Sequence, residues 1–272
     1  MNVEPGRDIP RIRIRHLHDF RRQGRRFSML TSYDQLSAAA FERAGIEVLL
    51  VGDSVGTVVL GHPSTVHTRH EDIVLFTGAV ARSVTRPLIV SDLAFGSYQA
   101  SVEDALRHGT ELLRAGAHAV KLEGGQRVVP QVSALVEAGI PVMGHLGFTP
   151  QSEHALGGFR VQGREQSEAD RLAEDALALQ DAGAFAIVLE LVPASVAARV
   201  TEVVDIPTIG IGAGPDCNGQ VLVWQDMAGM SGFSGRFVKQ FAQLGHDLER
   251  AAAEYHREVA QGEFPTAEHS FE

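Results

Sequence analysis

Cysteine, positive charge and long apolar runs are all in short supply in this 272-residue sequence, and each shortage excludes a class of protein. The single cysteine, Cys217, cannot form an internal disulfide, which excludes a disulfide-stapled fold. No run approaches the roughly 18 apolar residues of a membrane span, and no apolar signal-peptide core stands near the start, so a membrane protein is not expected. Lysine and arginine number 24 against 34 acids, a net charge of −10 that disfavours a nucleic-acid partner. We therefore expect a cytoplasmic, globular protein.

The first 26 residues depart from this acidic balance. They hold eight arginines against three acids, Glu4, Asp8 and Asp19. The arginines are Arg7, Arg11, Arg13, Arg15, Arg21, Arg22, Arg25 and Arg26. The acids argue against a transit peptide and the brevity of the segment against a nucleic-acid arm. We interpret residues 1–26 as an arginine-rich helical segment that is either solvated or a subunit contact.

From residue 27 onward, short apolar runs alternate with longer segments of helical spacing. Continuous apolar runs are typical of parallel strands that are covered on both faces. The predicted strands are 27–31, 48–52, 88–91, 119–122, 140–144, 185–189, 206–210 and 221–224. Residues 168–182 have the apolar spacing of an amphipathic helix, and a terminal helix is expected to end at Gly262.

Four of the predicted strands follow a tripeptide that ends in Ala-Gly, at Gly45, Gly116, Gly139 and Gly183. Glycine in a left-handed conformation closes a helix before the chain turns into the next strand. Eight such β–α units over about 250 residues predict a (β/α)8 barrel, here a single catalytic domain over 27–272. A doubly wound sheet uses the same pattern, but residues 27–34 lack the glycine fingerprint that usually follows its first strand.

Acidic residues stand at the carboxyl ends of several predicted strands, where barrel enzymes build their active sites. Asp53, Asp92 and Glu123 follow the second, third and fourth strands. Neighbouring strands lie about 4.8 Å apart, so three carboxylates would repel one another unless a cation lay between them. An all-oxygen set favours a hard ion such as Mg²⁺. The alternative is that each acid caps the helix after its strand.

Three further residues at strand ends suit acid–base or substrate-binding chemistry. Lys121, one of two lysines, shares a strand face with Glu123 and either pairs with a substrate carboxylate, forms a Schiff base, or balances the acids. Glu190 follows an apolar run, and half-burial would raise its pKa towards that of a general base, unless it is a cap or structural ion pair. His145 either orients a substrate or is a core histidine.

Two glycine-containing segments and the cysteine admit weaker interpretations. Gly210–Gly214 follows the seventh strand, where barrels often bind phosphate, although glycines also allow a tight turn. Residues 147–163 form a long polar loop that we predict closes over a ligand. Cys217 has no matching base nearby in the sequence, so a nucleophilic role is not expected.

Taken together, the motifs of this chain resemble those of the 3-methyl-2-oxobutanoate (ketopantoate) hydroxymethyltransferase family, from about residue 10 to the C-terminus. The matching segments are MLTSYD (29–34), VLLVGDSVG (48–56), LGHPST (60–65), VKLEGG (120–125), PVMGHLGFTPQS (141–152), GGFRVQG (157–163), IVLE (187–190), IGIGAGPDCNGQVLV (209–223) and HSF (269–271). Many separate motifs in the same order make a chance agreement implausible.

The resemblance implies a Mg²⁺-dependent (β/α)8 barrel, commonly a decamer, of the pantothenate pathway. Its reaction transfers a one-carbon unit from 5,10-methylenetetrahydrofolate to 3-methyl-2-oxobutanoate, which gives 2-dehydropantoate. By position, Asp53, Asp92 and Glu123 would hold the metal, and Glu190 would accept the proton. The residues that would bind the keto acid are Asp53, Ser54, Asp92 and Lys121, with His145 and Tyr33 lining the same pocket.

The chain departs from the family pattern at Phe76, Ala94 and Gly235, where histidine, proline and proline are usual. None of these positions is an expected metal or base residue, so they bear on folate or subunit contacts rather than on the reaction class.

Rival interpretations are a Mg²⁺-dependent lyase of the phosphoenolpyruvate mutase or isocitrate lyase type, a metal-free Schiff-base aldolase using Lys121, and a catalytically silent barrel. The lyases usually carry a lysine-cysteine-glycine loop, and this sequence has no such tripeptide.

Overall fold

The computed structural model describes residues 11–271, and the chain divides into two compact units between Leu222 and Val223. Glu4, Arg7 and Asp8 of the arginine-rich segment lie outside the described residues. The first unit holds eight strands and the second holds the C-terminal helices. The assignment of 27–272 to one domain stays a prediction.

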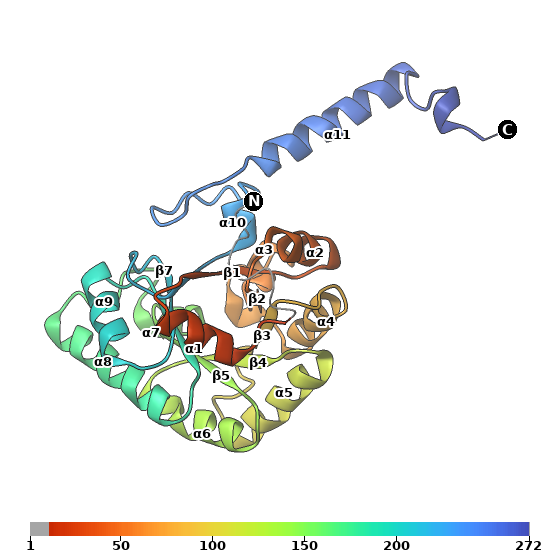
Figure 1. Cartoon of the computed structure of the whole chain (residues 1–272). Helices are drawn as coiled ribbons and strands as arrows, with labels where there is room; N and C mark the ends of the chain where they lie inside the picture. Colours follow the sequence, from red (N-terminus) through yellow and green to blue (C-terminus); the bar gives the residue numbers. More distant parts are fainter. Residues whose placement is uncertain (1–10, 272) are drawn as a thin grey trace. The chain divides into compact units, whose positions relative to one another are not determined.

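The eight strands form a closed parallel barrel in sequence order, with β1 paired to β8, as Figure 1 shows in part. The strands are β1 (Phe27–Thr31), β2 (Val48–Val51), β3 (Leu88–Asp92), β4 (Ala119–Glu123), β5 (Val142–Gly147), β6 (Ala186–Glu190), β7 (Thr208–Ile211) and β8 (Gly219–Leu222). The predicted (β/α)8 barrel is confirmed, and an open doubly wound sheet is wrong.

Three of the predicted strands start two residues away from the observed strand, for identifiable reasons, and the other five agree to within one residue at each end. The predicted strands 140–144 and 206–210 each contain a proline, and β5 and β7 begin at the residue after it. Proline has no N–H to donate to a neighbouring strand, so it stands at the strand entrance. The predicted strand 221–224 ends early because Trp224 already belongs to a helix, and β8 begins at Gly219.

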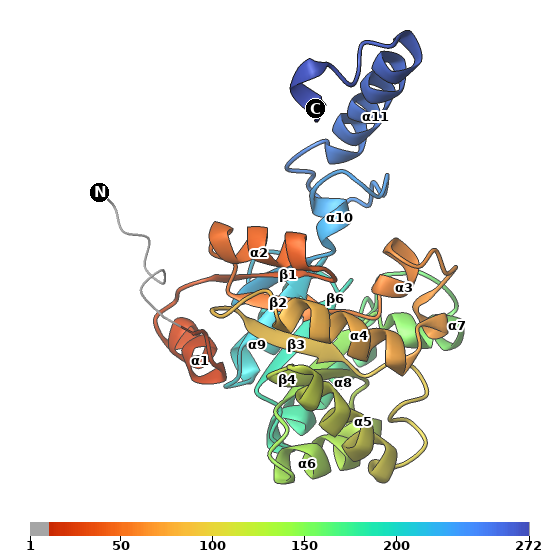
Figure 2. The ribbon, with the colours of Figure 1, turned by 90° about the vertical axis from the view of Figure 1, so that its right-hand side faces the viewer.

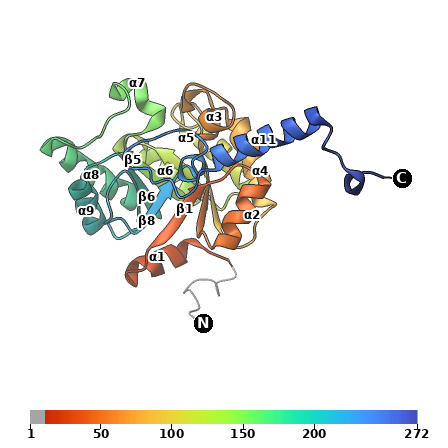
Figure 3. The same cartoon turned by 90° about the horizontal axis from the view of Figure 1, so that it is seen from above.

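Helices cover the outside of the barrel, and Figure 3 shows α8 and α9 on the side of the strands opposite α2 and α4. The helices that follow the strands are α2 (Gln35–Ala44), α3 (Val55–Val58), α4 (His70–Ala81), α5 (Val102–Ala115), α6 (Val129–Glu137), α7 (Glu153–Leu156), α8 (Gln166–Asp181) and α9 (Ala194–Val203), of which the four-residue α3 and α7 lie at the carboxyl end of the barrel. Helix α8 confirms the amphipathic segment predicted at 168–182. Gly45 and Gly116 end α2 and α5 at φ 92° and 116°, the left-handed conformation expected of them.

The amino end of the barrel is closed by apolar side chains from α1 (Ile14–Arg22) and the residues around it. Ile12, Leu17 and Phe20 are buried in one cluster with inward side chains of the strands, among them Met29 and Val48. Figure 2 shows α1 on one side of the barrel and α3 and α7, which follow the carboxyl ends of β2 and β5, on the other. The helix predicted within 1–26 therefore packs on the amino end of the barrel through one face, so it is not a fully solvated helix, and a subunit contact of this segment stays a prediction.

The second unit contains α10 (Trp224–Met227) and α11 (Leu244–Gln261). The predicted terminal helix is confirmed, because α11 ends at Gly262 with φ 71°. Within residues 11–271, no helix combines the length and the apolar character that crossing a membrane requires.

Candidate active site

The carboxyl end of the barrel continues the inward alternation of the strands, but with charged side chains. In β3, Leu88 and Val90 point into the core, so Asp92 comes next on the same face. In β4 the same spacing runs from Ala119 to Lys121 and Glu123. Every second side chain of a strand points into the barrel. These inward side chains are apolar along most of the barrel and charged at its carboxyl end, where they form a buried polar layer.

Asp53 joins this layer from the loop after β2. Its side chain is 5% exposed, and its backbone N–H donates to Oδ2 of Asp92 at 3.0 Å. Lys121 Nζ lies 3.0 Å from Oδ1 of Asp92, and both side chains are almost fully buried. Burial, together with the carboxylates of Asp92 and Glu123, raises the pKa of Asp53 to about 8.

The electrostatic surroundings of Lys121 decide between two of its predicted roles. Burial favours the neutral amine, but the carboxylates of Asp92, Glu123 and Asp53 outweigh it and raise the pKa of Lys121. A Schiff base needs a neutral amine as nucleophile. The site therefore holds Lys121 as an ammonium ion, which suits the pairing of a substrate carboxylate and not the aldolase interpretation.

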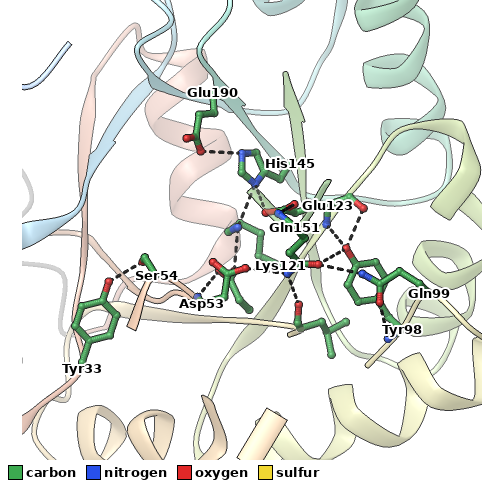
Figure 4. A network of polar contacts seen from close by, with 12 residues as sticks. Tyr33, Asp53, Ser54, Tyr98, Gln99, Lys121, Glu123, His145, Gln151 and Glu190 are labelled. Atoms are coloured by element: carbon green, nitrogen blue, oxygen red, sulfur yellow. Dashed lines mark hydrogen bonds and ion pairs between the residues drawn. The ribbon is translucent and has the colours of Figure 1, made fainter. Parts of the chain in front are cut away.

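His145 links Glu123 to Glu190 across the barrel mouth, as Figure 4 shows. Its Nδ1 lies 3.4 Å from Oε1 of Glu123 and 3.3 Å from Nζ of Lys121, and its Nε2 lies 3.2 Å from Oε2 of Glu190. Burial and the Lys121 ammonium lower the pKa of His145, but its close contacts with the carboxylates of Glu123 and Glu190 prevail and raise it to about 9. An imidazolium between two carboxylates fixes the position of both.

Glu190 is the most exposed member of this group. Its side chain is 14% exposed, against 2% for Glu123 and 3% for His145. A carboxylate that is held by an imidazolium and still reaches the mouth is placed to meet a bound molecule.

Tyr33 and Ser54 form a separate pair at the edge of the layer. The two hydroxyls lie 2.7 Å apart, and burial raises the pKa of Tyr33, so its phenol stays protonated. Ser54 follows Asp53 directly and stands at the start of α3. All eight predicted site residues therefore lie at the same end of the barrel, on β3–β6 or on the loops after β1 and β2.

Sequence reasoning missed Gln151, which connects the acids to one another. Its side-chain N–H donates to Oδ2 of Asp53 at 2.9 Å, and its backbone N–H donates to Oε2 of Glu123 at 3.0 Å. The Tyr98 hydroxyl and the Gln99 amide both donate to its side-chain oxygen. Gln151 lay within the motif 141–152, but an uncharged amide in a predicted loop carries no signal of its own.

The helix-cap alternative is wrong for the four acids. The N-cap positions of the helical elements after β2, β3, β4 and β6 are Ser54, Ser101, Gly125 and Pro193. The acids instead face one another in the barrel mouth.

The weaker sequence candidates lie apart from this group. Cys217 is buried, and burial raises the pKa of its thiol, which disfavours a reactive thiolate. Gly212 and Gly214 have φ of 63° and 79°, as a tight turn requires, and phosphate binding there stays a prediction. Residues 147–163 are not a structureless loop, because they include α7 and a 3-10 turn at Pro150–Ser152.

The donor set fits a hard divalent cation. Asp53, Asp92 and Glu123 are 5%, 2% and 2% exposed, and burial raises the pKa of both aspartates. Three buried carboxylates with one ammonium and one imidazolium nearby form an oxygen-rich set that a bound Mg²⁺ would stabilise. The three predicted metal ligands therefore share one buried polar layer, and a metal bound between them stays a prediction.

Comparison with known proteins identifies the family. The family model described as ketopantoate hydroxymethyltransferase matches residues 11–267. The chain belongs to this family. A Saccharopolyspora erythraea 3-methyl-2-oxobutanoate hydroxymethyltransferase is 56% identical over 264 residues, covering 96% of this chain and 90% of the relative. The Mycobacterium tuberculosis protein of the same name is 52% identical over 271 residues, covering 98% and 96%.

Two solved structures with other names share the barrel fold at low sequence identity. A phosphonopyruvate hydrolase in complex with oxalate and Mg²⁺ has a TM-score of 0.63 at 14% identity, covering 94% of this chain and 92% of its own. A 2,3-dimethylmalate lyase has a TM-score of 0.58 at 16% identity, covering 94% and 92%. At such identities the likeness shows only the barrel fold, so it does not favour the lyase interpretation over the family assignment.

Proposed function

We propose that this chain transfers a one-carbon unit from 5,10-methylenetetrahydrofolate to 3-methyl-2-oxobutanoate. With one water, the products are 2-dehydropantoate and tetrahydrofolate, a step of pantothenate biosynthesis. The observation that carries the proposal is the buried layer of three carboxylates and one ammonium, with the His145–Glu190 pair above it, in a chain of this family.

Binding of the keto acid uses the charges at the bottom of the site. Asp53, Asp92 and Glu123 would hold Mg²⁺, which when bound withdraws electron density from a 2-oxo group and so acidifies the neighbouring C–H. Lys121 is an ammonium ion at the same depth as Asp92, so we assign it to the carboxylate of the substrate. Ser54 and Tyr33 offer hydroxyl donors from the edge of the layer.

Proton transfer falls to Glu190. The reaction needs a base for the C3 proton of the keto acid, and the Glu190 side chain is the most exposed carboxylate of the layer. His145 holds that carboxylate through Nε2 and so orients it towards the substrate. Loss of the proton leaves C3 nucleophilic, the one-carbon unit is added there, and water supplies the hydroxyl oxygen.

The folate co-substrate needs room beside this site. A cavity of about 670 Å³ lies next to the ends of β4 and β5, and Gly124 and Gly147 line it. Its walls also include Arg127 and Arg160, whose guanidinium groups suit the carboxylates of a folate glutamate tail. We assign the co-substrate to this cavity and retain residues 147–163, which line part of it, as a lid that excludes water. Deleting the tip of this segment should slow turnover, and an unchanged rate would refute the lid.

A turnover assay tests the proposal. Tetrahydrofolate formation from the two substrates is measured with Mg²⁺ and with excess EDTA. We expect turnover that stops on chelation and returns with added Mg²⁺. Turnover that survives chelation would refute the metal role, and its absence in both conditions would refute the activity.

A homo-oligomer, a decamer by analogy with the family, also remains a proposal, and light scattering would test it.

A further inference from the structure

A second group of metal-binding side chains lies outside the barrel mouth. His70 opens α4, while His108 and Glu111 stand one turn apart on α5, the helix packed beside it. One ligand atom from each of the three side chains lies within 4.8 Å of the others. None of the three contacts the carboxylate layer, and the proposed reaction uses none of them.

The hydrogen bonds of His108 define which of its nitrogens is available. Its Nδ1 lies 2.6 Å from the backbone carbonyl oxygen of Ser97. A carbonyl can only accept, so Nδ1 carries the proton and Nε2 has the lone pair. A histidine whose other N–H donates to a backbone carbonyl is typical of metal ligands, because that bond fixes the tautomer and the ring orientation.

His70 is a neutral imidazole, and one of its two ring nitrogens has no hydrogen-bond partner in the protein. Its side chain is 8% exposed, its Nε2 lies 2.9 Å from Oε2 of Glu111, and its buried Nδ1 has no hydrogen-bond partner. Burial and the neighbouring His108 lower the pKa of His70 despite the Glu111 carboxylate. A neutral imidazole is the form that binds metals.

The charges around the group favour a cation. Glu71 and Glu111 both act on His70. Arg107 is the opposing charge, with a guanidinium nitrogen 3.4 Å from Nε2 of His108. The same guanidinium group is paired with Asp104 at 2.7 Å, and the Arg107 side chain is 61% exposed. The guanidinium group can therefore move away from Nε2 of His108 and keep its ion pair with Asp104.

We propose that His70, His108 and Glu111 bind one transition-metal ion of the Zn²⁺ class between α4 and α5. Two imidazoles and one carboxylate suit Zn²⁺ or Co²⁺ rather than Mg²⁺, and they leave a fourth position for water. Because His108 also holds the carbonyl of Ser97, the ion ties the two helices to the loop that carries Tyr98 and Gln99.

Co²⁺ titration of the tag-free full-length protein tests this site. Saturating Mg²⁺ is present throughout to compete with Co²⁺ for the carboxylate layer, and the strong visible d–d absorption of four-coordinate, nitrogen-ligated Co²⁺ is followed, which six-coordinate Co²⁺ on oxygen ligands does not give. We expect one equivalent to bind and Zn²⁺ to displace it. His108→Gln should weaken Co²⁺ binding by at least about tenfold, since even lesser changes around metal ligands cost 10–100-fold.

His246→Gln is the matched control. His246 and Glu249 have the same i,i+3 spacing as His108 and Glu111, but their side chains are 80% and 83% exposed, and within residues 11–271 they belong to no group of three metal-binding side chains. This variant should bind Co²⁺ as the parent protein does. If His108→Gln does not fold, Glu111→Gln takes its place, because that side chain is 44% exposed.

The proposal is overturned if the parent protein gives no saturable Co²⁺ absorption. It is also overturned if the folded variant, His108→Gln or its substitute, binds Co²⁺ as tightly as the parent protein. Neither result depends on turnover, so this test and the test of the proposed reaction fail independently.

Discussion

The two ends of the barrel are built from the same eight strands but have opposite interiors. At the amino end, Leu17 and Phe20 of α1 pack on Met29 and Val48 in an apolar cluster. At the carboxyl end, the strand interiors continue into a buried layer of carboxylates, the ammonium of Lys121 and an imidazole. Burial of apolar surface stabilises the fold, whereas burial of like charges costs free energy unless a counter-charge is present. We therefore call the amino end of the barrel, with its apolar cluster, the stabilising end, and the carboxyl end, with its buried charged layer, the chemical end.

The largest expected effect is on the chemical end alone. Glu190→Gln removes the proposed base without changing the shape of the side chain, so kcat should fall roughly 10²- to 10⁴-fold. The thermal midpoint should stay close to that of the parent protein. Glu137→Gln, on the exposed face of α6, is the control and should leave kcat unchanged. A Glu190→Gln variant with parental kcat would remove the base from Glu190.

The stabilising end should give the converse result. Leu17→Ala opens a cavity at a side chain with no exposed surface, so the free energy of unfolding should fall by about 2–5 kcal/mol. The kcat of the folded fraction should not change. Denaturant unfolding and turnover measure the two quantities, and Leu36→Ala, at a side chain that is 81% exposed, should alter neither. A matching loss of kcat in Leu17→Ala would show that the two ends are coupled.

Gln151→Met probes the support of the metal ligands. It removes the donor to Asp53 and the acceptor for Tyr98, so the apparent affinity for Mg²⁺ should fall about 10- to 100-fold. Gln99→Met removes one donor to Gln151 and the acceptor for the Gly96 N–H, but no contact with a predicted metal ligand, so its effect should be smaller. Activity measured against Mg²⁺ concentration gives both values. Equal affinities in the parent and Gln151→Met would mean that the amide does not support the ligands.

The smallest effect is expected at the cavity wall. Arg160→Ala should raise KM for a polyglutamyl folate by less than about tenfold, because an exposed charge pair contributes little. KM for the keto acid should not change. Arg114→Ala, on the outside of α5, is the control. A rise in the keto acid KM instead would place the cavity on the path of the other substrate.

The fold and most of the site follow from local patterns in the sequence. Apolar runs gave the strands to within a few residues, and errors arose where Pro141 and Pro207 shift the strand start. Asp92, Lys121 and Glu123 were predictable because strand ends converge in a barrel. The links made by Gln151 and His145 were not, since they join residues 22 to 98 positions apart through side-chain rotamers. The packing of α1 on the amino end of the barrel was also hidden, because its charge masks three apolar residues.

The role of Glu190 is tested most directly by the first half of the reaction. The C3 proton of 3-methyl-2-oxobutanoate is followed by NMR in D₂O, with Mg²⁺ and without folate. The account predicts that the parent protein exchanges this proton for deuterium, that Glu190→Gln does so at a small fraction of that rate, and that Glu137→Gln matches the parent. Equal exchange by the parent protein and Glu190→Gln would contradict it.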